Sequence, residues 1–327
     1  MRLIILLCAS ILLFACPAQK ENSIGFVERL DAELDKILDK NATIELLADG
    51  FTWSEGPVWI EQHNMLLFSD VPKNTIYKWT EANGAELYLT PSGFTGAETQ
   101  SREPGSNGLL LDDKGNLVLC QHGDRRMAYM DAPLNNPKPE FVTLADDYNG
   151  NKFNSPNDAA YYNGELYFTD PPYGLPEQEH DPSREIPFQG VYKISKNGTV
   201  ILLIDSLTRP NGIAFTPEGA MIVANSDGQK ARWYTYVLND SSIISGEILY
   251  DATDLVATEK GLPDGLKIDS KGNIFATGPG GVFIFNPSGK LIGKIKLTEA
   301  SSNCALSGDE KMLYVTNHRY VIRVSLK

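Results

Sequence analysis

Histidine and cysteine are scarce in this sequence, with four of each in 327 residues. No histidines have the spacing of a zinc-binding motif, and no Gly-x-Ser-x-Gly element is present. No expected strand is followed by GxGxxG, and no segment matches an EF-hand loop. These absences argue against a zinc domain, a serine hydrolase of the α/β type, a dinucleotide-binding domain and an EF-hand protein.

Positive charge is scarce as well. Lys and Arg total 29 against 42 Asp and Glu, the formal net charge is −13, and no basic run exceeds the pair Arg125-Arg126. Binding to nucleic acid requires a clustered basic face, so we expect no nucleic-acid partner. A cation or a neutral small molecule is the expected partner.

The apolar run at the N-terminus is too short to cross a membrane as a helix. It spans the 13 residues from Leu3 to Ala15 and follows Met1-Arg2, whereas a spanning helix needs ~20 residues. The pattern predicts a signal peptide over residues 1–16. Its end resembles a bacterial lipoprotein box with Cys16 as the lipidated residue, and ordinary secretory cleavage near a cysteine is the alternative. We therefore expect export, with a lipid anchor as the only membrane contact, at the periplasmic face of the envelope or in the outer membrane.

The sequence does contain a repeated hairpin pattern. In its clearest copy, Asn154 to Gly174, a strand opens at Asn157, the chain turns at Asn163-Gly164, and a second strand ends at Asp170. The leading polar residues of the six copies are 52, 50, 54, 53 and 39 residues apart: Glu55, Asn107, Asn157, Asn211, Asp264 and Asn303. A period of roughly 40 to 50 residues built from hairpins is typical of a β-propeller.

We therefore predict an all-β fold, a six-bladed β-propeller of four-stranded blades over residues 42–327. The strand expected at Thr43 to Leu47 should complete the last blade and close the ring. Residues 17–41 are expected to form a tether and a short amphipathic helix, because apolar residues recur at helical spacing from Phe26 to Leu38. Cys120 and Cys304 fall in different blades, so two free, buried thiols are favoured over a disulfide.

The leading residues of the six hairpins should surround the central axis. Glu55, Asn157, Asn211 and Asp264 would supply two carboxylates and two amide oxygens, hard ligands that suit Ca²⁺ best. Sites of this kind can also take Mg²⁺, Mn²⁺ or Zn²⁺. Taken singly, Asn-Gly and Asp-Gly are turn formers, but a turn alone does not require an acid or an amide in all six copies.

The second strand of each hairpin returns to the same end of the ring. Its last polar residues are therefore candidate substrate groups, with His122 and Asp170 among them. A solvated loop is the alternative for His122. Two long connections, residues 92–105 and 171–189, should lie over the axial opening and could cover a substrate, since loops of this length are usually functional.

Six short motifs follow one another along the chain: SEGPVW from Ser54, SNGLLLD from Ser106, SPND from Ser155, YFTDPPYG from Tyr167, RPNG from Arg209 and PDG from Pro263. In this order they resemble the SMP-30/gluconolactonase/LRE family of six-bladed propellers. The resemblance implies one catalytic divalent cation held by Glu55, Asn157, Asn211 and Asp264. It also implies hydrolysis of sugar lactones, which makes a small sugar lactone the expected partner.

The resemblance also bears on substrate contacts. Asn107 matches a substrate-contacting position of the family, whereas the arginine that some animal members carry two residues earlier is Gly105 here. Nearby arginines are Arg102, Arg125 and Arg126. The predicted substrate-binding set consists of Asn107, His122, Asp170, Tyr173 and Arg125.

The expected mechanism has the cation polarise the lactone carbonyl while a water attacks the carbonyl carbon and Asp264 takes the proton. His122 or Asp170 would orient hydroxyls of the sugar or share the role of the base. One alternative is a phosphotriesterase or arylesterase on the same propeller, although the polar loops favour a sugar. The other is a non-catalytic propeller that binds a partner at the cell surface, for which a complete ligand set would be unnecessary.

Overall fold

The computed structural model describes residues 24–240 and 242–327. The predicted signal peptide and the lipidation site Cys16 lie outside this part of the chain and stay predictions. Every helical segment in the described residues is a short 3-10 helix, and none is long and apolar enough to span a membrane.

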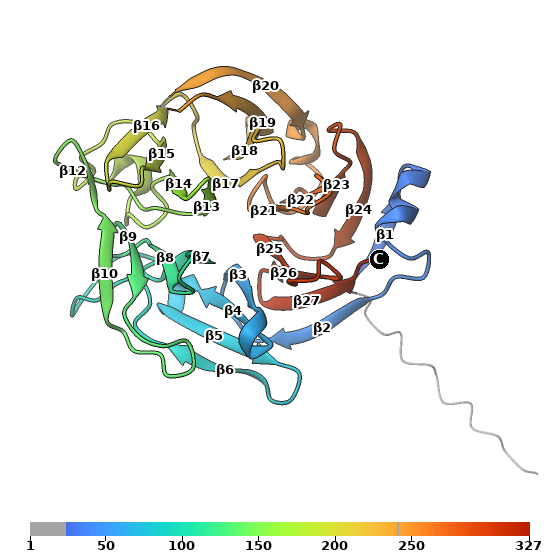
Figure 1. The fold of residues 1–327 in the computed structure, drawn as a ribbon, viewed down its shortest axis with the longest axis horizontal. Helices are drawn as coiled ribbons and strands as arrows, with labels where there is room; N and C mark the ends of the chain where they lie inside the picture. Colours follow the sequence, from blue (N-terminus) through green and yellow to red (C-terminus); the bar gives the residue numbers. More distant parts are fainter. Residues whose placement is uncertain (1–23, 241) are drawn as a thin grey trace, which may run out of the picture.

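Six sheets surround a central axis, which confirms the predicted six-bladed propeller (Figure 1). The first two blades are β3 (Ser54–Ile60), β4 (Met65–Asp70), β5 (Thr75–Thr80) and β6 (Gly84–Leu89), then β7 (Ser106–Leu111), β8 (Leu117–Gln121), β9 (Arg126–Met130) and β10 (Phe141–Ala145). The next two are β13 (Ala159–Tyr162), β14 (Glu165–Asp170), β15 (Gly190–Ile194) and β16 (Val200–Ile204), then β17 (Pro210–Phe215), β18 (Met221–Asp227), β19 (Lys230–Leu238) and β20 (Ile243–Asp251).

The fifth blade contains β21 (Leu266–Ile268), β22 (Ile274–Gly278), β23 (Gly281–Phe285) and β24 (Leu291–Leu297). The sixth contains β25 (Asn303–Leu306), β26 (Met312–Asn317), β27 (Tyr320–Ser325) and β2 (Ile44–Asp49). A separate small hairpin joins β11 (Asp147–Tyr148) to β12 (Asn151–Lys152). The first strand of each blade lies nearest the axis, so the six leading residues come together at one end of it.

The ring is closed by pairing the two ends of the propeller sequence. Strand β2 pairs antiparallel with β27 as the outer strand of the sixth blade, with Ile44 opposite Val324 and Leu46 opposite Ile322. This pairing confirms the closing strand expected at Thr43 to Leu47. Its backbone hydrogen bonds join the first and last parts of the propeller sequence and so close the ring.

The amphipathic helix predicted from Phe26 to Leu38 is wrong. The segment instead forms strand β1 (Gly25–Arg29), which adds a fifth strand to the fifth blade by pairing with β24, and the 3-10 helix η1 (Ala32–Lys36). The free edge of β24 offers backbone partners that a helix could not use. Leu34 and Leu38 are fully buried against this blade, whereas Phe26 stays 62% exposed. The apolar residues that suggested one helix therefore belong to two elements, an edge strand and a short 3-10 helix.

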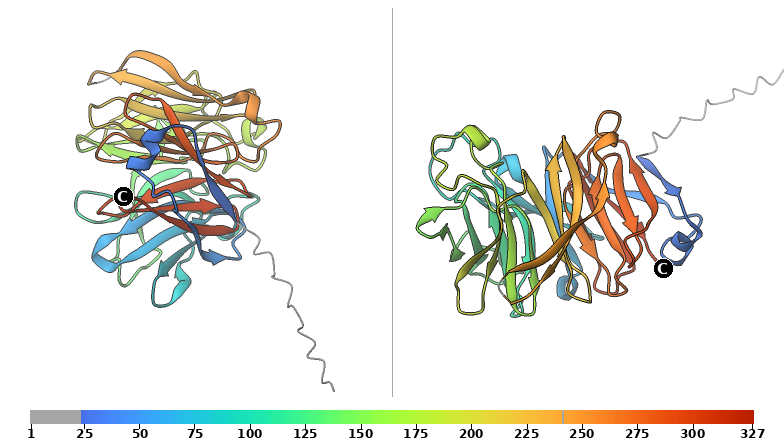
Figure 2. Two further views of the ribbon diagram at one scale, coloured as in Figure 1. Left: turned by 90° about the vertical axis from the view of Figure 1, so that its right-hand side faces the viewer. Right: turned by 90° about the horizontal axis from the view of Figure 1, so that it is seen from above.

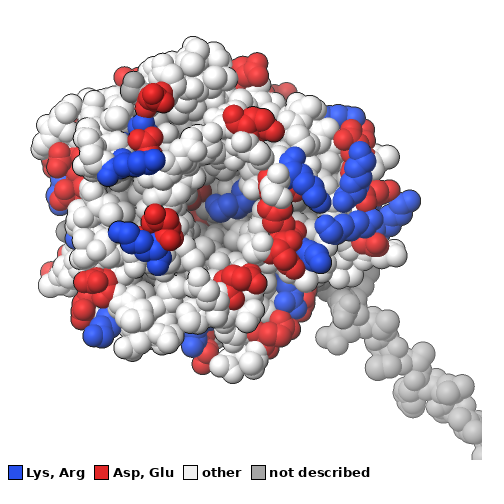
Figure 3. Space-filling view, viewed as in Figure 1, with Lys and Arg blue, Asp and Glu red and all other residues white. Residues whose placement is uncertain are grey.

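The hydrophobic core lies between adjacent blades as separate clusters. Large aromatic side chains such as Trp233, Phe168 and Phe283 are fully buried there. Cys120 and Cys304 belong to different clusters and are free and buried, as predicted. On the face drawn in Figure 3, acidic and basic side chains alternate around the rim, and no broad basic surface is visible.

Gly56 is required where the first two inner strands converge. Its φ is +50°, and a Cβ there would lie 2.0 Å from the carbonyl oxygen of Asn107. We expect Gly56→Ala to lower the free energy of unfolding by about 3 kcal/mol or more, from backbone strain and overpacking together. Gly198→Ala is the matched control, because Gly198 has a φ of +84° but open space around it. Chemical denaturation of both variants would measure the difference, and equal losses would contradict the steric explanation.

Candidate active site

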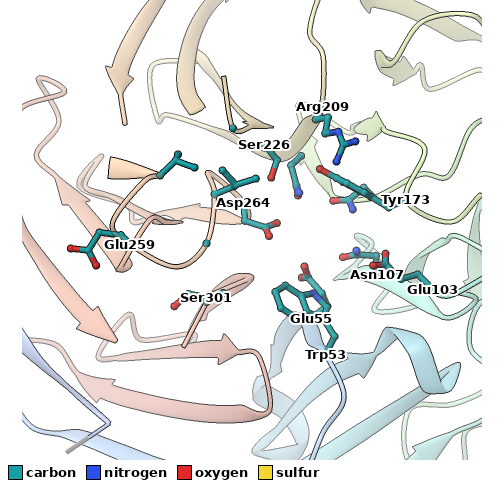
Figure 4. A pocket seen from close by; sticks show the side chains of 17 residues that line it. Trp53, Glu55, Glu103, Asn107, Tyr173, Arg209, Ser226, Glu259, Asp264 and Ser301 are labelled. Atoms are coloured by element: carbon teal, nitrogen blue, oxygen red, sulfur yellow. The ribbon is translucent and has the colours of Figure 1, made fainter. Parts of the chain in front are cut away.

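A cavity of about 460 Å³ opens at one end of the propeller axis. Five of the six leading residues line it, each at or just before the start of an inner strand: Glu55, Asn107, Asn157, Asn211 and Asp264 (Figure 4). The side chains of the first four are buried, and Asp264 is partly exposed to the cavity. In the right-hand view of Figure 2, the short helices η4 (Gln178–His180, yellow-green) and η5 (Thr253–Leu255, orange) project from one common face.

Hydrogen bonds between blades fix the backbone of these leading residues. The carbonyl of Asn107 accepts from Ser69 Oγ of the preceding blade at 3.0 Å. The carbonyl of Asn157 accepts from the Gly108 N–H at 2.8 Å, and that of Asn211 accepts from Thr169 Oγ1 at 2.7 Å. Since the backbone is held by the neighbouring blade, the side chains remain free to face the axis.

Several oxygens of this ring have no hydrogen-bond partner in the described part of the protein. They are Oδ1 of Asn107, Asn157 and Asp264, all buried. A buried oxygen without a partner is unfavourable by about 1–3 kcal/mol. Such atoms pointing into a common cavity therefore indicate a ligand that takes their lone pairs.

Burial and mutual repulsion dominate the electrostatics of the ring carboxylates, because Arg209, which lines the same cavity, pairs with Glu179 at 3.1 Å. Burial, followed by the charges of Asp158 and Glu103, raises the pKa of Glu55 to about 8. Burial and the neighbouring charge of Glu55 raise the pKa of Asp264 well above its ordinary value. A divalent cation would relieve both effects, and the oxygen donors fit a hard cation such as Ca²⁺.

The donor set is balanced between acids and amides. In residues 24–240 and 242–327, no group of three or more His, Cys, Asp or Glu side chains could hold a metal by itself. Any cation in the cavity would therefore need amide oxygens beside the carboxylates of Glu55 and Asp264, and Asn107, Asn157 and Asn211 line the same cavity. The ligand set of Glu55, Asn157, Asn211 and Asp264 stays a prediction.

Two members of the predicted substrate-binding set, Asn107 and Tyr173, line the cavity. Tyr173 comes from the 171–189 connection, so that connection reaches the axial opening as expected. Burial raises the pKa of its hydroxyl, which keeps it a neutral donor. His122, Asp170 and Arg125 are not among the residues that line the cavity.

The side chain of Asp170 holds a backbone segment in place. Its carboxylate is fully buried and accepts the N–H groups of Asn154 and Ser155 at 2.8 and 2.7 Å. Asp70 accepts the N–H groups at the start of the first blade in the same way, and Asn225 does so in the fourth. The repeated polar residue at the end of the second strand thus holds the segment entering the blade, which argues against the predicted substrate contact.

This role for Asp170 makes a prediction that separates stability from binding. Asp170→Asn should lower the free energy of unfolding by about 1–3 kcal/mol, because the amide can replace only part of the acceptor capacity. The KM for substrate should remain within about twofold, since binding energy from a direct hydrogen bond is not lost. Asp205→Asn, at an exposed position, is the control. A raised KM with unchanged stability would restore the prediction of substrate contact.

Arg125 likewise stabilises connecting segments through hydrogen bonds to their backbone. Its Nε donates to the carbonyl of Phe153 at 2.6 Å, and Nη1 donates to that of Ser183 at 3.0 Å. Its guanidinium therefore ties two segments together outside the cavity. The sequence suggested a substrate contact because an arginine near the active end of a blade cannot be distinguished from a loop anchor without knowing its partners.

His122 lies behind the wall of the cavity and is fully buried. Its Nε2 is 3.4 Å from Nδ2 of Asn157, and burial lowers its pKa to about 3. The imidazole is therefore neutral at physiological pH. It contacts Asn157, which lines the cavity, but does not line the cavity itself. The predicted direct contact with a sugar hydroxyl is not supported.

The sequence predictions missed three charged residues that line the cavity, Glu103, Arg209 and Glu259. Arg209 packs over the ring of Tyr173 at 5.5 Å and pairs with Glu179 at 3.1 Å. It lies two residues before Asn211 in the RPNG motif, a position that could have identified it. Glu103 lies two residues before the end of the long 92–105 connection, and the expected position of this connection over the axial opening was the available signal.

Comparison with known proteins bears on this cavity. A profile described as the SMP-30/Gluconolactonase/LRE-like region matches residues 53–319. The chain is 37% identical over 317 residues to a gluconolactonase of Zymomonas mobilis subsp. mobilis, covering 94% of this chain and 87% of the relative. It is 23% identical to a pentonolactonase of Haloferax volcanii, covering 80% of each. A solved gluconolactonase from Xanthomonas campestris superposes with a TM-score of 0.78 at 27% identity, covering 92% of this chain and 95% of the other.

Proposed function

The chain belongs to the SMP-30/gluconolactonase/LRE-like family, and from this premise we propose that it hydrolyses a sugar lactone with the help of one divalent cation. The observation that carries the proposal is the set of buried, unpartnered oxygens that converge on the axial cavity. The enzyme class is a hydrolase of carboxylic esters, in keeping with its gluconolactonase relative.

Glu55, Asn157, Asn211 and Asp264 would hold the cation, with Ca²⁺ the favoured ion. When bound, such an ion supplies Lewis acidity toward a carbonyl oxygen. Asp264 accepts a proton from the attacking water, because its carboxylate is the ring member most open to the cavity and its Oδ1 has no protein partner.

The cavity wall suits a polyhydroxylated ring. Asn107, Tyr173 and Arg209 present an amide, a phenol and a guanidinium from three different segments. The cavity volume of about 460 Å³ falls within the range of small-molecule sites. These donors favour a sugar lactone over the hydrophobic aryl esters or phosphotriesters of the alternative hydrolase hypothesis.

The test is pH-stat hydrolysis of a panel of aldonolactones by the protein, before and after chelation and again after Ca²⁺ is restored. Turnover that requires the cation would support the proposal, and the panel would identify the substrate. If Ca²⁺ bound but no lactone were cleaved, the lactonase proposal would fail. Aryl esters and phosphotriesters would then be tested on the same preparation.

A further inference from the structure

Glu103 faces the reaction space from the side opposite Asp264. Figure 4 shows the two carboxyl groups on opposite sides of the cavity, with Glu55 between them and Asn107 beside Glu103. The carbonyl carbon and the ring oxygen of a lactone are adjacent atoms, so water activated from one side of the cavity can attack the carbon while an acid on the other side reaches the ring oxygen. The cavity thus has a carboxyl group on each side of the expected substrate, of which the mechanism above uses only one.

The 92–105 connection that carries Glu103 is firmly anchored. Asn74 Oδ1 accepts the N–H groups of Gly93 and Phe94 at 2.7 and 3.1 Å. At the other end of the connection, the N–H of Gly105 donates to the carbonyl of Val71 at 2.9 Å. Because both ends are held by the first blade, Glu103 has a defined position at the cavity wall.

The carboxyl group of Glu103 has an environment suited to holding a proton. Its side chain is 32% exposed, and Nδ1 of His122 lies 3.6 Å from its Oε2. Burial keeps His122 neutral, so it places no positive charge beside the carboxyl group. Burial raises the pKa of Glu103 to about 7.

The hydrogen bond on the other side of His122 determines which nitrogen carries the proton. The amide nitrogen of Asn157 can only donate, so His122 Nε2 accepts from it and Nδ1 is protonated. Nδ1 lies 3.6 Å from Oε2 of Glu103, and the imidazole also interacts with the backbone of Glu103. Because Nδ2 of Asn157 faces His122, Oδ1 of the same amide faces the axis. His122 therefore connects the position of Glu103 to the ring of oxygens.

We propose that Glu103 is the general acid of the reaction and protonates the ring oxygen of the lactone as it leaves, with His122 as its positioning residue. The assignment rests on the proposed lactonase function. Water adds to the carbonyl carbon and gives one proton to Asp264. The bond between the carbonyl carbon and the ring oxygen then breaks, and the ring oxygen takes the proton of Glu103. The products are a hydroxyl group and a carboxylic acid. Asp264 then loses the proton it gained and Glu103 takes one up, which restores the starting state, while the product acid releases its own proton to solvent.

Other ionisable groups face Glu103 and will influence its titration. The cavity that Glu103 lines is shared by Glu55, Asp264, Glu259, Tyr173 and Arg209, and His122 lies behind Glu103. A general acid must be protonated to act, so kcat of the wild type should fall as the pH rises through the pKa of Glu103 in the cation-loaded enzyme. This limb of the profile should be missing when Glu103 is replaced.

Leaving-group dependence provides the decisive experiment. An aldonolactone releases a poor leaving group, an alkoxide, whereas the matched thiolactone with sulfur in the ring releases a thiolate that needs no acid. Glu103→Gln should lower kcat on the lactone by on the order of 10²-fold or more, but on the thiolactone by less than about 10-fold. Glu98→Gln, at an exposed position in the same connection, should leave both rates unchanged. Formate should partly rescue Glu103→Ala on the lactone.

The positioning role of His122 has its own signature. His122→Leu should reproduce the selective loss on the lactone, and His122→Gln, which can still donate and accept, should restore most of it. Equal losses on both substrates, or none in Glu103→Gln, would overturn the assignment of Glu103 while leaving the lactonase function intact. Failure of the wild-type protein to cleave any lactone would instead overturn the proposed function on which it rests.

Discussion

Replacement of Asp264 by asparagine should lower kcat/KM for lactone hydrolysis by on the order of 10²–10⁴-fold, the range expected when a general base is lost. The substitution keeps the shape of the side chain and one oxygen for the cation, but an amide cannot accept the proton of the attacking water. Asp264 is partly open to the cavity and its Oδ1 has no protein partner. The fold should therefore be preserved.

The measurement is pH-stat kinetics of Asp264→Asn beside Asp113→Asn, a control at an exposed turn. Thermal unfolding of both variants would show that the loss does not come from misfolding. Burial and the charge of Glu55 raise the pKa of Asp264, so replacing it should also relieve repulsion in the cation-free protein. Retention of more than about a tenth of the wild-type kcat would exclude Asp264 as the base.

Removal of divalent cations should abolish turnover and destabilise the fold together. A cation that binds only the folded state adds about 2.7 kcal/mol when its free concentration is 100 times its Kd. Calorimetry with a chelator and then with added Ca²⁺ would measure this shift in Tm. Glu55→Gln should bind the cation more weakly, and its Tm should respond less to Ca²⁺ at the same concentration. A Tm insensitive to both treatments would contradict the proposed site.

The cation-free protein should also have a characteristic dependence on pH. The pKa of Glu55 is about 8 in the folded state, against an ordinary value of 4.5. Between these two values the folded protein keeps a proton that the unfolded chain has released, so stability falls as the pH rises. Bound Ca²⁺ should remove this fall, because the ionised carboxylate is then paired. The Tm at several pH values, with and without Ca²⁺, would test it.

The propeller could be predicted from the sequence because each blade repeats a local rule. Alternation of apolar residues, a turn and a polar leading residue are properties of about twenty neighbouring residues, and the hairpins in Figure 1 follow them. The closing strand β2 was also predictable, since the last repeat lacked its fourth strand. The segment from Phe26 to Leu38 was not, because its conformation depends on the open edge of β24, which is distant in sequence.

The residues of the candidate site also separate into those that could be predicted from the sequence and those that could not. Glu55, Asn107, Asn157, Asn211 and Asp264 share one position in the repeat, so the geometry of the ring carries all of them to the same cavity. The functional contribution of Asp170 could not be inferred from its position in the repeat. Its carboxylate is taken up by the backbone of the entering loop, a partner that appears only when the chain is folded.

The sequence by itself determined the blade number, the closure of the ring and the polar residues that surround its axis, because all three follow from a repeated local pattern. Only the tertiary structure decided which charged side chains complete the cavity. Glu103 and Arg209 enter it from long connections whose paths are set by contacts with other blades, such as those of Asn74 with Phe94 and of Arg209 with Glu179. Contacts between distant segments produce no repeated pattern in the sequence. The structure was therefore needed to recognise these residues as part of the cavity.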